Sequence, residues 1–201
     1  MYPKLSETID YIKSSTINKS RKEILQPLID YIKQNKNLPT NINFICTHNS
    51  RRSHLCQIWA QVAADFYGIA EVNCFSGGTE ETELFPKVAA TLREQGFEIE
   101  KISSQSNPVY GIKFGENNLP IIGFSKKYDH FFNPASRFVA IMTCSQADVG
   151  CPFIAGAEKR IPITFEDPKI SDGLPNQHEV YTNRSLEIAS EMFYVFSQIK
   201  K

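Results

Sequence analysis

The stretch from Phe44 to Ser53 constrains the fold of this chain more than any other. A short apolar run over residues 42–46 is typical of a buried strand. Beyond Ser53, apolar residues recur with helical spacing, and they are Leu55, Ile58, Trp59, Val62, Ala63 and Phe66. The sequence therefore predicts a strand at 42–46, a short loop, and an amphipathic helix at about 53–67.

A loop between a strand and a helix is suited to hold an anion, because backbone N–H groups and the helix dipole converge there. Cys46 starts this loop, and the same field favours its thiolate, which is the nucleophilic form. The guanidinium of Arg52 can hold two oxygens of a tetrahedral oxyanion, and Ser53 can donate to the thiolate. The predicted oxyanion-binding residues are Thr47, His48, Asn49, Ser50, Arg51 and Arg52. The alternative interpretation is a small buried cysteine followed by a basic first turn of a helix.

The pattern Cys46-x5-Arg52-Ser53 resembles the phosphate-binding loop of the low-molecular-weight protein tyrosine phosphatases. Thioredoxin-coupled arsenate reductases share that loop and that fold. The resemblance continues at residues 75–79, 142–152 and 165–168, and it covers most of the chain from about residue 41. It implies an α/β three-layer sandwich with a central four-stranded parallel sheet and the phosphate loop after the first strand.

Composition excludes several classes of protein. The 22 lysines and arginines balance the 22 aspartates and glutamates, so no overall field attracts nucleic acid or an acidic membrane. The sequence contains no apolar run long enough to span a bilayer, and residues 1–7 lack the apolar core of a secretory signal. Five scattered cysteines indicate free thiols in a reducing compartment. We expect a cytoplasmic protein without a metal or an organic cofactor.

Two segments fall outside the family pattern. Residues 1–40 read as an N-terminal helical extension to a phosphatase-like domain at 41–201, with a possible capping box at 20–23. The apolar stripe of this extension could pack on the core or form a homodimer. Residues 98–137 read as an insertion beside the site that contains a β-hairpin, whose aromatic residues favour packing over substrate binding.

The remaining elements alternate between strands and helices, as in a parallel sheet that helices cover on both faces. The predicted strands are 72–75, 138–143 and 161–165, and the predicted helices are 86–95 and 181–199. A turn is expected at Gly77-Gly78, and Pro162 suits an edge strand.

Asp167, which precedes Pro168, is the candidate general acid. Ligands bind at the carboxyl ends of the strands in an open parallel sheet, where Cys46, Cys144 and Asp167 are expected to converge. A carboxylic acid there can protonate the oxygen that leaves phosphorus or arsenic. The resemblance implies the same role, whereas an ordinary Asp-Pro turn is the alternative. Strand alternation directs the neighbouring Glu166 differently.

Cys144 and Cys151 distinguish two chemistries. Their spacing is not that of a zinc site, and six residues between them suit one helical turn that unwinds easily. The resemblance to arsenate reductases implies a relay in which Cys46 attacks arsenate, Cys144 releases arsenite, and Cys151 resolves the disulfide for a thioredoxin-like reductant. Two unrelated thiols are the alternative.

Other residues refine this interpretation. Lys169 and Ile170 follow Asp167-Pro168, where the phosphatases usually carry tyrosines, and this weakens the case for phosphotyrosine. Asn49 is expected to brace the loop, His48 to lie at its rim, and Arg51 to add positive charge. The two remaining cysteines, Cys56 and Cys74, are expected in the core.

Three functions therefore remain open. The first is a cysteine-relay arsenate reductase. The second is a phosphatase that hydrolyses phosphomonoesters, phosphotyrosine among them, through a phosphocysteine intermediate. The third is a non-catalytic sensor of oxyanions or redox state.

Overall fold

The computed structural model describes residues 1–35 and 38–199. Residues 36–37, close to the predicted domain boundary at residue 40, and residues 200–201 lie outside the description. The helices are α1 (Pro3–Lys13), α2 (Lys19–Gln34), α3 (Arg52–Phe66), α4 (Pro86–Glu94), α5 (Ser145–Gly150), the 3-10 helix η1 (Pro168–Ser171) and α6 (Gln177–Ser197). The strands are β1 (Thr40–Cys46), β2 (Val72–Gly78), β3 (Glu98–Lys101), β4 (Tyr110–Lys113), β5 (Ile121–Gly123), β6 (Phe138–Met142) and β7 (Ala157–Pro162). Within the described ranges, no helix is both long and apolar enough to cross a membrane.

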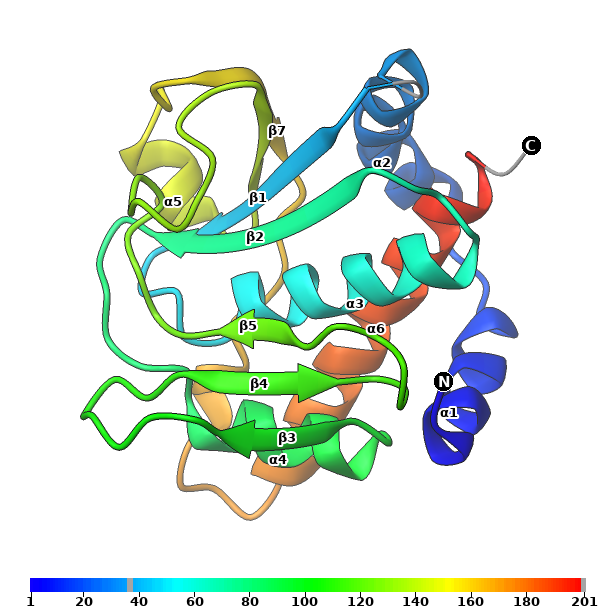
Figure 1. Cartoon of the computed structure of the whole chain (residues 1–201), viewed down its shortest axis with the longest axis vertical. Coiled ribbons are helices and arrows are strands. Elements are labelled where there is room, and N and C mark those ends of the chain that lie inside the picture. The colour runs from blue at the N-terminus through cyan, green and yellow to red at the C-terminus, as the bar shows by residue number, and fades with distance from the viewer. Residues whose placement is uncertain (36–37, 200–201) are drawn as a thin grey trace.

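The central sheet has four parallel strands in the order β2-β1-β6-β7 (Figure 1). This confirms the predicted α/β fold. Strand β1 is central and carries Cys46 at its carboxyl end, opposite Gly78 of β2. Strand β6 lies on its other side and leads into Cys144. The parallel arrangement thus brings two cysteines, 98 residues apart along the chain, to one edge of the sheet.

Successive side chains of a strand point to opposite faces of the sheet, and β1 shows this alternation. Phe44 packs in the main core with helices α3 and α6. Ile45 packs on the other face, in a smaller cluster with Cys46, Cys144 and Ile154. Both faces are therefore covered, as in the expected three-layer arrangement.

Helices α1 and α2 pack against the main core. Their buried residues are Leu5, Ile9, Ile12, Leu25, Leu28, Ile29, Tyr31 and Ile32, all part of the same apolar cluster as α3 and α6. Arg21 of α2 also forms a bidentate ion pair with the buried Glu191 of α6 at 2.6 and 2.8 Å. The apolar stripe thus faces its own chain and is not available to a second subunit. Asn18, rather than the predicted capping box at 20–23, caps α2 by accepting from the Arg21 N–H.

The segment 98–137 contains a separate antiparallel sheet in the order β3-β4-β5. The predicted hairpin is confirmed as β4 and β5, whereas β3 was not expected, because three of its four residues are charged. Figure 1 shows α3 between the two sheets, and α3 contacts β1, β2 and β5. We expected the aromatic residues of this segment to pack on the hairpin, but the Phe131 side chain is exposed.

Two predicted strand boundaries are wrong. The last strand is 157–162 rather than 161–165, because an edge strand with polar residues at 158–160 gives no apolar signal. Strand β2 continues through Gly77 and Gly78, which we expected to form a turn. A Cβ atom on Gly77 would lie 2.4 Å from the Tyr128 backbone, and one on Gly78 would lie 2.8 Å from the Thr47 carbonyl oxygen. These glycines therefore permit close packing of the backbone beside the phosphate loop.

Candidate active site

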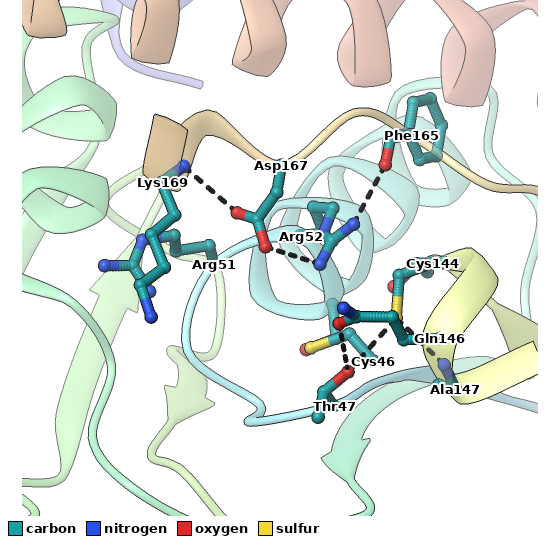
Figure 2. Close-up of polar contacts among 12 residues, drawn as sticks. Cys46, Thr47, Arg51, Arg52, Cys144, Gln146, Ala147, Phe165, Asp167 and Lys169 are labelled. Atoms are coloured by element: carbon teal, nitrogen blue, oxygen red, sulfur yellow. Dashed lines mark hydrogen bonds and ion pairs between the residues drawn. The ribbon is translucent and has the colours of Figure 1, made fainter. Parts of the chain in front are cut away.

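The loop from Cys46 to Arg52 joins β1 to α3 at the carboxyl edge of the sheet (Figure 2). Asn49 has a φ of 44°, in the left-handed region, where asparagine is tolerated better than most residues. This conformation turns the chain sharply enough for a loop of five residues to connect the strand to the helix.

The carbonyl groups of the loop are bonded to neighbouring segments. The oxygens of Cys46, Thr47 and Ser50 accept from the backbone N–H groups of Thr79, Glu80 and Phe85 at 2.8–3.1 Å. Within residues 1–35 and 38–199, no N–H of residues 47–52 donates to another protein group. The loop therefore offers a row of unused backbone donors beside a helix N-terminus, which is the chemistry of an anion site.

Cys46 is 4% exposed, and its sulfur lies 3.1 Å from the Ser53 hydroxyl. Ser53 also contacts the neighbouring Asn49. The Asn49 side-chain oxygen accepts from the Lys126 N–H at 2.9 Å, and its NH₂ group donates to the Ser53 oxygen at 2.8 Å. Ser53 thus retains its own hydrogen, which it can donate to the Cys46 sulfur. The predicted bracing by Asn49 is confirmed.

Arg52 joins the loop to the candidate general acid. Its guanidinium donates to the Phe165 carbonyl at 3.0 Å and to the Asp167 carboxylate at 2.6 Å (Figure 2). The side chain is 10% exposed and does not turn outward. Glu166, the neighbour of Asp167, is exposed. The structure thus brings Arg52 and Asp167 together above the loop.

Arg51 points elsewhere than we expected. Its guanidinium donates to Tyr181 and Asp172, each at 2.6 Å, and stacks over the Phe85 ring at 4.0 Å. The Arg51 charge is therefore neutralised on the far side of Asp167 and does not face the oxyanion site (Figure 2). The side chain of His48 lies at the rim, 43% exposed and 3.5 Å from Glu80.

Cys144 lies against the phosphate loop. Its sulfur is 3.5 Å from the Thr47 hydroxyl and accepts from the Ala147 N–H at 3.4 Å, so that it caps helix α5 (Figure 2). Cys151 caps the other end of this six-residue helix and is half-buried. Arg160 of β7 holds the helix in place by donating to the Cys151 carbonyl at 3.0 Å and by pairing with Asp148 at 2.5 Å.

Cys56 and Cys74 are buried in the core, as expected. Burial raises the pKa of both thiols well above its ordinary value, so they stay protonated and unreactive. The sequence interpretation is confirmed for these two residues.

The segment before Tyr128 supports the loop through contacts that no sequence pattern indicated. The Ser125 hydroxyl donates to the His48 carbonyl at 2.9 Å, and the Lys126 N–H holds Asn49 as described above. These residues lie 77 positions from the loop in sequence, and no local pattern links the two segments. They are found only through the tertiary contacts.

The Lys126 side chain is fully buried beneath the loop. Its nearest polar partners are the Ser76 hydroxyl at 3.4 Å and the Phe124 carbonyl at 3.5 Å, and it lies over the Phe124 ring. Burial lowers its pKa from 10.5 to about 7. Burial lowers the pKa of the neighbouring His54 to about 3, and the charge of Lys126 makes a smaller contribution in the same direction. His54 is therefore neutral, and its Nδ1 lies 3.2 Å from the same Ser76 hydroxyl.

A polar cavity of about 450 Å³ adjoins Arg52 and Asp167. Side chains from three other parts of the chain line it, and they include Arg21, Gln146, Arg184 and Glu187. The cavity thus extends from the candidate site toward helices α2, α5 and α6. It is larger than a single tetrahedral oxyanion requires.

Comparison with known proteins agrees with this architecture. The family model "Low molecular weight phosphotyrosine protein phosphatase" matches residues 41–114. The arsenate reductase of Staphylococcus aureus strain Newman is 30% identical over 153 residues, which are 76% of this chain and 94% of that protein. A low molecular weight phosphotyrosine phosphatase of Vibrio cholerae O395 has a TM-score of 0.54 at 13% identity, over 79% of this chain and 94% of that chain. An arsenate reductase in its oxidized state has a TM-score of 0.53 at 20% identity, over 80% of this chain and 98% of that chain.

The fold and the loop define a class of α/β proteins with an anion-binding loop that begins at a cysteine. The chain belongs to the low-molecular-weight phosphotyrosine protein phosphatase family, whose members include arsenate reductases. This is a family of cysteine-dependent enzymes. The two solved structures show that the fold is shared.

Proposed function

We propose that this chain is an arsenate reductase in which Cys46 is the nucleophile and Cys144 and Cys151 form a thiol relay. The position of Cys144 carries this proposal. Its sulfur lies 3.5 Å from the hydroxyl of Thr47, the residue directly after Cys46. A second thiol beside the nucleophile is what reduction of an adduct requires, whereas ester hydrolysis would use water at that step.

In the first step, the loop N–H groups and Arg52 bind arsenate, and the Cys46 thiolate attacks arsenic. A sulfur–arsenic bond forms and an arsenic–oxygen bond breaks. Asp167 donates a proton to the departing oxygen, which leaves as water. The hydrogen bond between Ser53 and the Cys46 sulfur, at 3.1 Å, keeps this sulfur oriented for the attack.

In the second step, the Cys144 thiolate attacks the Cys46 sulfur. A Cys46–Cys144 disulfide forms, and the electron pair of the sulfur–arsenic bond passes to arsenic, which leaves as arsenite. Cys151 then attacks the Cys144 sulfur, so that a Cys144–Cys151 disulfide forms and Cys46 returns as a thiolate. Helix α5 separates these two cysteines by only six residues, and its unwinding would bring their sulfur atoms together.

The relay needs two electrons from outside for each turnover. A dithiol reductant of the thioredoxin type would supply them by exchange with the Cys144–Cys151 disulfide. Cys151 is the more accessible of the two cysteines, since it is half-buried while Cys144 is 1% exposed. A reducing compartment such as the cytoplasm would keep all three thiols ready for catalysis.

The cavity beside Arg52 and Asp167 favours a second candidate, which is hydrolysis of phosphomonoesters. Its volume of about 450 Å³ leaves room for an organic leaving group. In that reaction Cys46 forms a phosphocysteine, Asp167 protonates the leaving oxygen, and water resolves the intermediate. Cys144 has no part in it.

The Cys144→Ser variant separates the two reactions. We expect arsenate reduction with thioredoxin, thioredoxin reductase and NADPH to fall by at least about 100-fold, because the step that releases arsenite loses its nucleophile. Aryl phosphatase activity should stay within about twofold of wild type, since water resolves the phosphocysteine. Both activities are measured side by side on each protein.

Disulfide mapping by mass spectrometry after one turnover with arsenate supplies a second readout. Wild type should contain a Cys144–Cys151 disulfide, and Cys151→Ser should accumulate the Cys46–Cys144 disulfide. Cys74→Ala is the matched control, because it removes a buried thiol of the core and should behave as wild type. Arsenate reduction without either disulfide would contradict the relay. Binding of arsenate without turnover of either substrate would indicate the sensor.

A further inference from the structure

The phosphate loop ends in two consecutive arginines, and each binds an aspartate of the same short segment. Arg52 pairs with Asp167 at 2.6 Å, and Arg51 pairs with Asp172 at 2.6 Å. The two aspartates flank the 3-10 helix η1. Asp167 is its N-cap and Asp172 is its C-cap. The segment that carries the candidate general acid is therefore held at both ends by the loop that binds the oxyanion.

The ion pair between Arg51 and Asp172 lies in a network of hydrogen bonds. The Tyr181 hydroxyl and the Gln177 amide both donate to the Asp172 carboxylate, at 2.6 and 3.0 Å. Burial alone would raise the pKa of Asp172, but these bonds and the Arg51 charge lower it below its ordinary value. Arg51 is 12% exposed and lies over the ring of Phe85. Such a charge-assisted network has few alternative geometries, so it is suited to fix a position.

The two arginines meet different demands when substrate binds. Arg52 must turn part of its guanidinium toward the oxyanion, and its bond to Asp167 then competes with the substrate. The Arg51 guanidinium lies on the other side of Asp167 and has no such competitor (Figure 2). Its contact with Asp172 can persist throughout the reaction.

We propose that Arg51 and Asp172 are positioning residues that hold Asp167 over the leaving oxygen while Arg52 binds the oxyanion. Neither residue touches the substrate. They act through η1, which links Asp172 to Asp167 over five positions of backbone. This inference rests on the proposed role of Asp167 as general acid and holds whether the acceptor of its proton leaves phosphorus or arsenic.

The test compares leaving groups. A general acid matters most for a poor leaving group, because a good one departs without a proton. We expect Arg51→Met to lower kcat/KM for phenyl phosphate by about 30-fold, within the range of a misplaced general acid, and kcat/KM for 2,4-dinitrophenyl phosphate by less than about threefold, because kcat/KM reports the step in which the ester oxygen leaves. KM should change little, since Arg51 does not bind the oxyanion. Arg51→Lys keeps the charge but loses the two-pronged geometry, so it should fall between wild type and Arg51→Met.

Two further variants define the outcome. Asp167→Asn is the reference for complete loss of the acid and should show the same dependence on the leaving group, more strongly. The double variant Arg51→Met with Asp172→Asn should lose no more activity than the less active of the two single variants, because both substitutions break the same contact. An equal loss on both esters with Arg51→Met would overturn the inference and indicate a general effect on folding.

The result also separates this inference from the proposed function. If Asp167→Asn shows no dependence on the leaving group, the general acid is wrongly assigned and the inference fails with it. If Asp167→Asn shows the dependence and Arg51→Met does not, only the positioning role fails. The inference survives a wild type that hydrolyses aryl phosphates and does not reduce arsenate, whereas a wild type that turns over neither substrate overturns both.

Discussion

Cys46→Ser should abolish turnover of arsenate and of aryl phosphates alike, by about four orders of magnitude or more. Both proposed reactions begin with a bond from the Cys46 sulfur, and a serine hydroxyl at neutral pH is a far weaker nucleophile than a thiolate. The rest of the loop is built by other residues, among them Asn49, Ser53 and Arg52. Binding should therefore persist, and isothermal titration with inorganic phosphate and arsenate measures it.

The persistence of binding makes this prediction specific. A variant that lost both turnover and binding would have lost the loop rather than the nucleophile. Cys74→Ala again serves as the control, since its thiol lies in the core and its activity should stay within about twofold of wild type. Retention of more than about 1% of the arsenate reductase activity in Cys46→Ser would show that another residue is the nucleophile.

Lys126→Met should stabilise the protein at neutral and mildly acidic pH. The buried ammonium of Lys126 has a pKa of about 7, compared with 10.5 in water, so the unfolded chain binds this proton more tightly. The free energy of unfolding therefore rises with pH between about 7 and 10.5. The destabilisation by the buried Lys126 charge is fully present below pH 7. From pH 6 to pH 9.5, Lys126 should raise the free energy of unfolding by about 3 kcal/mol, at 1.36 kcal/mol per pKa unit.

Urea unfolding at pH 6 and pH 9.5 measures this effect. The difference between wild type and Lys126→Met isolates Lys126, because all other titratable groups are common to both proteins. The neighbouring Lys127 is exposed, and Lys127→Met should leave the pH dependence unchanged. The Asn49 contact uses the backbone N–H of residue 126, so the variant keeps the support of the loop. Equal pH dependence in wild type and Lys126→Met would show that this ammonium is not buried.

Local patterns predicted the elements that carry the chemistry. The strand, the loop and the helix around Cys46 are consecutive in sequence, so spacing alone reveals them, and the predicted and observed limits differ by at most two residues. Local patterns likewise predicted α4, α6 and the hairpin of β4 and β5. They missed β3 and misplaced β7, because edge strands with charged residues lack an apolar signal.

The roles of individual side chains depended on partners far away in the chain. Arg51 and Arg52 are adjacent and chemically identical, yet one faces Asp172 and Tyr181 and the other faces Asp167 and the oxyanion site. The Cys46-x5-Arg52 spacing points to Arg52 for the oxyanion, but no local pattern gives the partners of Arg51, because these depend on where η1 and α6 pack. The same holds for Lys126, whose burial and contact with Asn49 join segments 77 residues apart.

By itself, the sequence determined that a cysteine, an arginine and a serine share one turn at the end of a buried strand, since these relations depend only on backbone geometry over ten residues. It also determined that the chain has two more cysteines at a spacing that one helical turn can span. Only the tertiary structure decided that Cys144 lies against Thr47, that Asp167 is tied to Arg52, and that the N-terminal helices face their own core. These contacts join distant segments, and their geometry follows from how the strands order in the sheet and how the helices pack on it.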